Sequence, residues 1–357
     1  MANMKSKYWI AGWMIIVFLG LAMIGMWIYK IDPYFHYHKP NTSKYFYELN
    51  NQRSQNDGIA KHFDYDALIT GTSMTENFKT SEMDEIFGCT SIKIPFAGSS
   101  YKEIGNNLRT AVENNSDLKI VVCGLDMAKF LDDKDLMRDD LGNYPTYLYD
   151  TNPFNDVKYI WNRDIIWDRA YKMVEAKDEP GFIPGITSFD DYSSWDDETG
   201  LDVIWPDGIP EMWVGNPVYL SEEEKTVVEE NITQNVITLA KEHPEIEFYY
   251  FLTPYSAAWW ADLVKYGTIY KQIEAEEVVI NLMLDCENVK LFSFNNMLDI
   301  TCDLDNYKDE RHYGDWINSR MLEMMHEGEG VLTRNNYKEY LDEELHNYLE
   351  LNYGNLK

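Results

Sequence analysis

A serine and a histidine far apart in the chain are the residues best suited to covalent chemistry. Ser73 follows the short apolar run 67–69 and Gly71, and it precedes the amphipathic stretch 77–87. This order predicts a buried strand, a turn and a helix, so the hydroxyl lies at the carboxyl end of a strand. The N–H of a serine there faces the positive end of the helix, which suits a developing oxyanion. A serine that only caps the helix start fits the same pattern.

Near the other end of the chain, Asp309 and His312 are three residues apart. In a single helical turn or tight loop, this spacing lets the carboxylate accept the Nδ1–H of the imidazole and leaves Nε2 free to take a proton from a hydroxyl. A serine nucleophile needs such a base because its own pKa is far too high. The Asp-x-x-His pattern alone is common, and His62, just before the first expected strand, is the main rival as base.

Five short apolar runs alternate with helical patterns and predict a parallel α/β sheet. The strands are expected at 67–70, 91–95, 118–124, 247–252 and 289–294. Helices are expected at 77–87, 101–112, 221–243, 263–284 and, capped by Thr333, at 333–349. The pattern lapses between residues 130 and 220, a segment rich in Trp, Tyr, Asp, Pro and Gly with one expected helix at 155–174. This insertion is predicted to be a lid or specificity subdomain, whose aromatic side chains either stack on sugar rings or form core.

Residues 8–29 contain no charged side chain and match the roughly 20 apolar residues that cross a bilayer as a helix. No convincing signal-peptidase site precedes Lys30, so a retained signal anchor is the better interpretation. Lys5 and Lys7 precede the run, and the positive-inside rule then places the N-terminus in the cytoplasm and the rest outside. We therefore expect a cytoplasmic tip and anchor at 1–30, a juxtamembrane segment at 31–64 and an extracytoplasmic domain at 65–357.

The part of the chain beyond the anchor is strongly acidic. The whole sequence has 31 basic and 61 acidic residues, and only three of the basic ones (Lys5, Lys7 and Lys30) lie at or before the end of the anchor, which leaves 28 − 61 = −33. Such a surface repels nucleic acid, anionic lipid head groups and a bare polyphosphate polymer. Nucleic acid is therefore excluded as a partner.

No metal and no other cofactor is expected. Four cysteines show no metal-type spacing, although an exported chain permits a disulfide between the last two of them: Cys89, Cys123, Cys286 and Cys302. His36 and His38 form an HxH pair without a third ligand nearby, which favours an interfacial anchor over a metal site. The acidic residues at 190–191 and 196–198 do not match a calcium-binding EF-hand loop, which favours a solvated acidic loop.

The stretch 50–58 is unusually rich in amide side chains. Two interpretations remain open for it. It is either a plain polar loop or a segment folded back over the site that offers Arg53 or Asn56 to a substrate.

The order of these blocks resembles the SGNH (GDSL-type) hydrolase superfamily, which places Ser, Gly, Asn and His blocks on a flavodoxin-like sheet. Here Gly-x-Ser follows the first strand, Gly98 the second and Gly124-x-Asp126 the third, and Asp309-x-x-His312 comes near the end. The membrane anchor makes the chain similar to the branch encoded beside membrane-bound O-acyltransferases, which includes the teichoic-acid D-alanylation protein DltD and the alginate acetylation proteins. The resemblance covers residues 67 to about 324 outside the insertion.

By this resemblance, Ser73 is the nucleophile, His312 the general base and later acid, and Asp309 the group that orients His312. The N–H groups of Ser73 and Gly98 form the oxyanion hole. The resemblance implies a flavodoxin-like parallel sheet of about five strands with an aromatic-rich insertion, preceded by one transmembrane helix.

Two residues depart from the family pattern. Thr72 stands where the superfamily has an aspartate, and Asp126 stands where it has the oxyanion asparagine. An ionised carboxylate cannot donate a hydrogen bond to an oxyanion. Either Asp126 is protonated or has another role, such as substrate binding, or Asn77 substitutes for it, or hydrolysis is poor. Losing one oxyanion donor costs on the order of 10²–10³ in rate.

The sequence predicts a membrane-anchored extracytoplasmic serine esterase or acyltransferase. It would act on acyl esters of a cell-surface polysaccharide or teichoic-type polymer through an acyl-serine intermediate, with a multi-pass O-acyltransferase as partner. An alternative is a non-catalytic glycan-binding or scaffold partner of that acyltransferase on the same fold, motivated by Asp126 and the aromatic-rich insertion. A secreted lipase fits the membrane tether poorly.

Overall fold

The computed structural model describes residues 2–141 and 144–356. The chain divides into two compact units, which we call the N-terminal unit (residues 1–63 and 145–187) and the sheet unit (residues 64–144 and 188–357). The insertion expected at 130–220 is therefore not one subdomain. Its middle part, 145–187, belongs with the N-terminal unit, and its last part, 188–220, belongs with the sheet unit.

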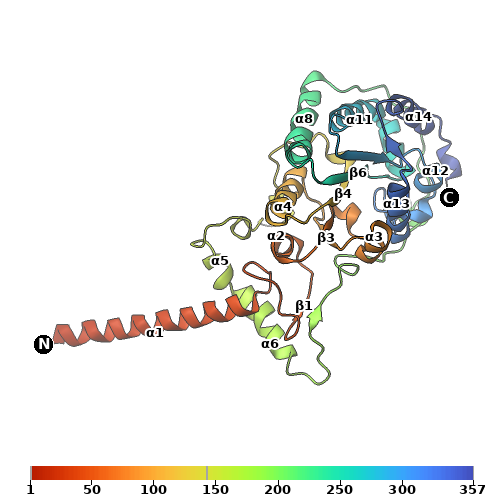
Figure 1. The fold of residues 1–357 in the computed structure, drawn as a ribbon. Coiled ribbons are helices and arrows are strands. Elements are labelled where there is room, and N and C mark those ends of the chain that lie inside the picture. The colour runs from red at the N-terminus through yellow and green to blue at the C-terminus, as the bar shows by residue number, and fades with distance from the viewer. Residues whose placement is uncertain (1, 142–143, 357) are drawn as a thin grey trace. The chain divides into compact units, whose positions relative to one another are not determined.

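A six-stranded sheet forms the centre of the sheet unit, with the order β3-β2-β4-β6-β7-β8 (Figure 1). Its strands are β2 (Ala67–Gly71), β3 (Ser91–Pro95), β4 (Ile120–Leu125), β6 (Glu247–Leu252), β7 (Val289–Ser293) and β8 (Val331–Leu332). The first five are parallel, and β8 is antiparallel to β7. The molecule thus has the predicted mixed α/β architecture with parallel strands. The two residues of β8 are too few to show a period in the sequence.

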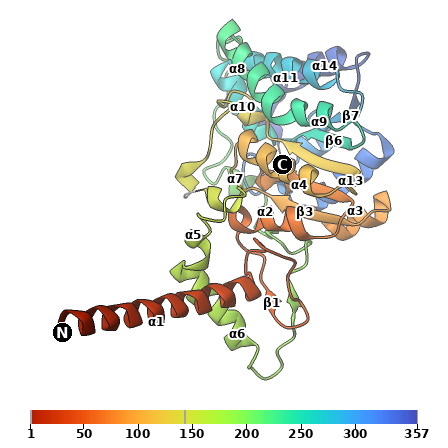
Figure 2. The ribbon, with the colours of Figure 1, turned by 60° about the vertical axis from the view of Figure 1, so that its left-hand side comes forward.

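Helices cover the sheet, with α8, α11 and α14 grouped apart from α3 and α13 in both ribbon views (Figures 1 and 2). The helices of this unit are α3 (Thr80–Phe87), α4 (Tyr101–Asn114), α7 (Leu201–Ile204), α8 (Glu222–Ile232), α9 (Thr238–Glu242), α10 (Ala257–Tyr266), α11 (Ile269–Met283), α12 (Leu298–Thr301), α13 (Asp315–Glu327) and α14 (Tyr337–Leu349). Short 3-10 turns are η1 (Ser73–Thr75), η2 (Met127–Lys129), η3 (Asp139–Leu141), η7 (Leu304–Asn306) and η8 (Tyr353–Asn355), and η6 (Thr233–Ile237) is a π-helical turn.

Three helix predictions in the sheet unit need correction. The helix expected at 221–243 is divided by the π-helical turn η6, and the one expected at 263–284 is two helices, α10 and α11. The last helix begins at Tyr337 rather than after a Thr333 cap, because Asn336 accepts the backbone N–H of Thr333 and occupies the cap position. The helix α13 contains His326, which the sequence placed in a helical stretch without bounds.

Two carboxyl groups meet inside the sheet unit. Glu276 of α11 and Glu344 of α14 are both fully buried and hydrogen-bonded to each other. Glu276 also accepts a hydrogen bond from the amide of Gln272 at 2.9 Å. Glu344 accepts one from the amide of Asn295 at 2.6 Å. Burial raises the pKa of both carboxyls, to about 8 for Glu276, since a charged group loses its hydration there. The folded state is therefore more stable when the two carboxyls are protonated than when they are charged.

This pair predicts that stability falls at alkaline pH. A carboxyl whose pKa is raised in the folded state contributes stability that is fully present below its unfolded pKa near 4.5 and is lost as pH rises towards about 8. Glu344→Gln keeps the hydrogen bonds without the charge. We expect it to leave the free energy of unfolding nearly unchanged at pH 5 and to raise it by about 1–3 kcal/mol at pH 9. Denaturant unfolding at the two pH values measures this, and exposed Glu339→Gln on the same helix is the control.

The N-terminal unit begins with one long apolar helix, α1 (Ala2–Ile31), of which residues Ser6–Ile31 are long and apolar enough to cross a membrane or to be a signal sequence. Its remaining elements are β1 (Phe46–Tyr47), α2 (Gln52–His62), the 3-10 turn η4 (Thr146–Leu148), α5 (Val157–Ile160), the π-helical turn η5 (Ile165–Tyr171), α6 (Lys172–Ala176) and β5 (Gly185–Ile186). The helix expected at 155–174 is thus three short pieces. Strands β1 and β5 pair in parallel, which ties residues 145–187 to the start of the chain.

The amide-rich stretch 50–58 is a helix start rather than a loop. The side chain of Asn51 accepts the N–H of Ser54 at 3.1 Å, and Gln55 accepts the N–H groups of Asn50 and Asn51 at 3.0 and 2.9 Å. These bonds satisfy N–H groups at the start of α2.

The two histidines that follow α1, His36 and His38, have partners inside the N-terminal unit. His36 Nε2 lies 3.2 Å from Asp156 Oδ1, and the two ring nitrogens of His38 lie 2.7 Å from the carbonyl oxygens of Tyr29 and Lys39. Both side chains therefore hold the turn that follows α1.

Candidate active site

The turn that carries Ser73 depends on the glycine two residues before it. Gly71 ends β2 with φ +144°, a backbone conformation that side chains with a Cβ rarely adopt. A Cβ at this position would lie 2.7 Å from Cγ2 of Thr75. The hydroxyl of Thr72 accepts the N–H of Met74 at 3.3 Å and starts the 3-10 turn η1. Ser73 thus lies half-buried at the carboxyl end of β2.

A tight hairpin carries His312. Tyr307 and Tyr313 form an isolated antiparallel bridge, and the N–H of Lys308 donates to the carbonyl of His312 at 3.0 Å. Inside the hairpin, one oxygen of Asp309 accepts the backbone N–H groups of Arg311 and His312 at 2.8 and 2.9 Å. The carboxylate is therefore fixed by the backbone of the same loop.

Two side chains dock this hairpin on the serine turn. The hydroxyl of Tyr313 donates to the carbonyl of Met74 at 3.1 Å, and the amide of Asn318 donates to the same carbonyl at 3.3 Å. On the other side, the hydroxyl of Ser256, after β6, donates to the carbonyl of Glu310 at 2.7 Å. The hairpin is thus held against the loops that follow β2 and β6.

The result is a continuous hydrogen-bonded chain of three side chains. Ser73 Oγ lies 2.7 Å from His312 Nε2, and His312 Nδ1 lies 2.7 Å from Asp309 Oδ2. Burial alone would raise the pKa of Asp309, but hydrogen bonds from the ring and backbone of His312 and from Arg311 outweigh it and lower the pKa to about 2. Asp309 is therefore ionised at neutral pH and favours the His312 tautomer that carries its proton on Nδ1.

Two backbone N–H groups lie at the same edge of the sheet. Strands β2 and β3 are parallel neighbours, so the turns that bear Ser73 and Gly98 follow adjacent strand ends. Gly98 has φ +65° in a turn closed by the N–H of Ser99 and the carbonyl of Phe96 at 3.1 Å. Among the described residues, the N–H groups of Ser73 and Gly98 have no hydrogen-bond acceptor. Both are free to donate to a substrate oxygen.

Asp126 follows β4, the other neighbour of β2. Its side chain is buried, with 6% of the residue exposed, and it accepts a hydrogen bond from the hydroxyl of Thr72. Its second oxygen has no partner among the described residues. Burial raises the pKa of this carboxyl, although the charges of Lys129, Arg311 and His312 act in the opposite direction.

Asn77 lies just after the serine turn and is buried. Its Oδ1 accepts the N–H of Trp195 at 2.8 Å, while its Nδ2 has no partner among the described residues. The ring of Trp195 stands edge-on to that of His312, with centroids 6.2 Å apart. Lys308 Nζ lies 3.7 Å from the Trp195 ring centroid and 2.7 Å from Asp197. Nothing in the sequence distinguished Trp195 from the other tryptophans.

A buried lysine supports the segment after the serine. Lys93 lies inside β3 with no exposed surface, and its Nζ donates to the carbonyls of Glu76, of Phe78 at 2.9 Å and of Asp190 at 3.3 Å. Burial lowers the pKa of this amine to about 8. The signal for this buried amine in the sequence is a lysine between the two isoleucines of a short strand.

The prediction of a solvated acidic loop is wrong for Asp190. Its carboxylate accepts the N–H of Ser81 at 3.0 Å and the hydroxyl of Thr80 at 3.0 Å, so it satisfies donors at the start of α3. The segment that leads to Trp195 is thereby attached to the helix after the serine turn.

Three residues considered from the sequence belong to the N-terminal unit. Arg53 and Asn56 lie on α2, and their role in substrate binding stays a prediction. His62 ends the same helix, and its Nε2 lies 3.4 Å from the carbonyl of His36. The histidine that is hydrogen-bonded to Ser73 is His312.

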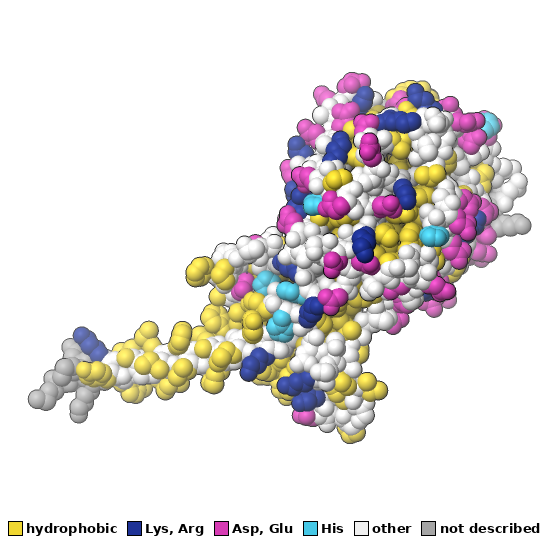
Figure 3. Space-filling view, viewed as in Figure 1, with side chains coloured by type: hydrophobic (Ala, Val, Ile, Leu, Met, Phe, Trp, Pro, Cys, Tyr) yellow, Lys and Arg dark blue, Asp and Glu magenta, His cyan; other side chains and the backbone are white. Residues whose placement is uncertain are grey.

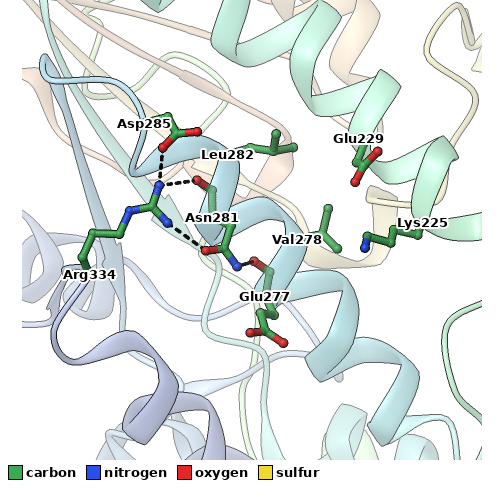
Figure 4. A pocket seen from close by; sticks show the side chains of 8 residues that line it. All are labelled: Lys225, Glu229, Glu277, Val278, Asn281, Leu282, Asp285 and Arg334. Carbon is green, nitrogen blue, oxygen red and sulfur yellow. Dashed lines mark hydrogen bonds and ion pairs between the residues drawn. The ribbon is translucent and has the colours of Figure 1, made fainter. Parts of the chain in front are cut away.

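A cavity of about 380 Å³ adjoins the site and is lined by Val203, Ile204, Asp309, Glu310, Arg311 and His312. A larger cavity of about 490 Å³ lies between α8 and α11, where Arg334 donates to Asn281 at 2.8 Å and to Asp285 (Figure 4). The larger one has mixed charges on its walls and no paired nucleophile and base. The smaller cavity is therefore the candidate substrate site.

All four cysteines are free thiols, so the disulfide that the sequence permits is absent from the structure.

No family model and no curated protein matches this chain. A solved structure described as "a putative platelet activating factor from Streptococcus pneumonia" is similar over 81% of this chain and 91% of that chain, with 11% sequence identity and a TM-score of 0.38.

Proposed function

We propose that this chain is a serine esterase or acyltransferase of the SGNH type, anchored in the cell membrane with its sheet unit outside. The observation that carries the proposal is the hydrogen-bonded chain from Ser73 through His312 to Asp309. A nucleophile, a base and a group that orients the base are together what acyl transfer needs. This chemistry uses no cofactor.

The proposed reaction begins with attack of Ser73 Oγ on an ester carbonyl while His312 Nε2 takes the hydroxyl proton. The N–H groups of Ser73 and Gly98 stabilise the oxyanion that forms. Collapse of this intermediate breaks the ester bond, and the leaving alkoxide takes the proton from His312. Water, or a hydroxyl of an acceptor, then gives its proton to His312 and attacks the acyl-serine. Collapse of this second intermediate breaks the bond to Ser73 Oγ, which takes the proton back from His312, and releases the acid or the new ester.

The strand order supports this assignment. Numbered along the chain, the five parallel strands have the spatial order 2-1-3-4-5, the order found in flavodoxin-like sheets. In such sheets, ligands bind at the carboxyl ends of the strands where the order reverses. Ser73 and Asp126 follow the two strands on either side of that point, β2 and β4.

The proposed substrate is an acyl ester of a cell-surface polysaccharide or a teichoic-type polymer. The apolar helix α1 and the two lysines before it support a cytoplasmic N-terminus. The charge of −33 beyond the anchor favours a neutral, zwitterionic or cationic ester over a bare polyphosphate. A multi-pass membrane acyltransferase is the proposed source of the acyl group.

The experiment that tests this proposal is labelling of the full chain in detergent with a fluorophosphonate, which reacts with serines activated by a neighbouring base. We expect stoichiometric labelling of the wild type, none of Ser73→Ala and unchanged labelling of Ser319→Ala, which removes a half-buried hydroxyl on α13. Peptide mapping locates the label. Equal labelling of Ser73→Ala would rule out the proposed nucleophile.

Asp126 predicts a pH dependence of turnover. Because burial raises its pKa, the carboxyl keeps its proton to a higher pH than usual, and its unpartnered oxygen can then donate to the oxyanion as an asparagine would. As pH rises through this pKa, the donor is lost and a negative charge replaces it. We expect kcat on an activated acetyl ester to fall at alkaline pH by on the order of 10²–10³.

Asp126→Asn supplies an amide donor at every pH. We expect this variant to match the wild type at the optimum and to lack the alkaline decline, while exposed Asp139→Asn keeps the wild-type profile. A loss of about 10² at all pH values in Asp126→Asn would show instead that the ionised carboxylate is the working form.

A further inference from the structure

Ile160 of α5 and Trp161, the residue that follows α5, pack against the second half of α1. The indole Nε1–H of Trp161 donates to the backbone carbonyl of Leu21 at 3.2 Å. A Cβ on Gly25 would lie 3.1 Å from Cγ2 of Ile160, so the absence of a side chain there lets the backbone of α1 approach closely. The contact is thus formed partway along α1 and not at its end.

The position of this contact fixes its depth if α1 spans a bilayer. The apolar part of α1, Ser6–Ile31, has 26 residues, whereas a bilayer core needs roughly 20. Every stretch of about 20 residues within that range contains both Leu21 and Gly25. At 1.5 Å per residue, a span of about 20 residues that ends at Gly25 places Leu21 about 6 Å below the outer edge of the hydrocarbon core. Trp161 and Ile160 therefore contact α1 at the level of the membrane.

Large apolar side chains of the same segment are exposed. Phe154 is 86% exposed and Trp167 is 56% exposed, and Val157, Trp161 and Tyr171 are exposed as well. Exposed apolar surface is unfavourable in water, so such a cluster indicates an interaction surface. Tryptophan and tyrosine are enriched where a protein meets the head-group layer of a membrane.

The charge of the two units supports a lipid partner for this surface. Without Lys5 and Lys7, which the proposed topology places on the cytoplasmic side, the N-terminal unit has 10 basic and 10 acidic residues and no net charge, whereas the sheet unit has 19 and 51, a net charge of −32. An anionic membrane surface repels the sheet unit but not the N-terminal unit. Figure 3 shows hydrophobic side chains along α1 and numerous Asp and Glu side chains on the visible face of the sheet unit.

We propose that residues 153–171 form a second membrane contact, in which α5 and η5 lie in the interfacial layer of the lipid bilayer beside α1. Phe154, Trp161 and Trp167 would insert among the head groups and upper acyl chains. The charged residues between them, such as Lys158 and Asp164, suit this layer and not the hydrocarbon core. The inference rests on the proposed membrane span of α1 and is independent of the catalytic assignment. It gives the N-terminal unit the role of a platform on the membrane surface.

The test is quenching of tryptophan fluorescence by brominated lipids, with the full chain in nanodiscs. The emission of a single tryptophan is obtained by subtracting the emission of the variant that lacks it from that of the wild type. We expect the emission of Trp167, measured in this way with Trp167→Phe, to be present in ordinary nanodiscs and largely lost when the upper acyl chains carry bromine. Phe154→Trp, at a highly exposed position, should add emission that bromine also quenches. Trp213→Phe is the matched control in the sheet unit, at 52% exposure, and its difference should be equal in both lipids.

Trp13→Phe, within α1, tests the premise separately. If bromine quenches Trp13 but neither Trp167 nor the tryptophan introduced at position 154, α1 is in the bilayer and the proposed second contact is wrong. This outcome would leave the surface to a protein partner. If none of the three is quenched, the membrane span and the second contact are both wrong. Ester turnover by the chain is expected to be the same in Trp167→Phe as in the wild type.

Discussion

Replacing Ser73 with alanine is expected to lower kcat on an activated acetyl ester by a factor on the order of 10⁴ or more, as removal of a serine nucleophile does in other hydrolases. The hydroxyl is half-buried and lies 2.7 Å from His312 Nε2. Among the described residues, no other serine is hydrogen-bonded to the ring of His312 and could replace it. The methyl group of alanine fits the space that the serine leaves, so the fold should be unchanged. The measurement is the rate of ester hydrolysis by the purified chain.

The double variant Ser73→Ala/His312→Ala provides the sharper form of this prediction. Residues that act as one unit are not additive, so the double variant should be about as slow as either single variant. If the loss of kcat in the double variant instead equals the product of the two single losses, the two residues act separately. If Ser73→Ala, expressed in a deletion strain, instead restores the wild-type cell envelope in full, the chain acts as a binding or scaffold protein.

Replacing Asp309 with asparagine is expected to lower kcat by about 10⁴ with little change in KM. The remaining side-chain oxygen of the asparagine can still accept the backbone N–H groups of Arg311 and His312, so the hairpin keeps its shape. The amide nitrogen, however, donates where the carboxylate accepted. His312 would then carry its proton on Nε2, where it cannot accept the proton of Ser73.

Substitution of another acidic residue in the same loop controls for charge. Asp305→Asn removes an exposed carboxylate before the hairpin and should leave kcat unchanged. The side chain of Asp309 is about half exposed, at 49%, so water can partly replace it. A loss smaller than about 10-fold in Asp309→Asn would mean that solvent orients His312 and that Asp309 is not needed for this role.

The parts of the fold predicted best are those with strong local signals. The bounds of β3 and β6 agree with the sequence prediction to the residue, because both are short apolar runs between polar turns. The helix α2 was missed because its start is stabilised by Asn51 and Gln55, amide side chains that are also typical of loops. Local patterns could not show that 145–187 joins the N-terminal unit, since this depends on the two-residue strands β1 and β5.

For the site, the sequence by itself determined which chemistry was available. It supplied a serine after Gly71, an Asp-x-x-His pair with the spacing for an oriented base, and an apolar helix long enough for a membrane. These features are local, so residue type and spacing suffice to find them.

Only the tertiary structure decided whether those residues meet. Ser73 and His312 are 239 residues apart, and their 2.7 Å separation depends on Tyr313 and Asn318 docking the hairpin on Met74. The burial of Asp126 and Lys93, which shifts their pKa values, likewise comes from neighbours distant in the chain. Distances, burial and charge state arise from packing between strands and loops, and no local pattern encodes that packing.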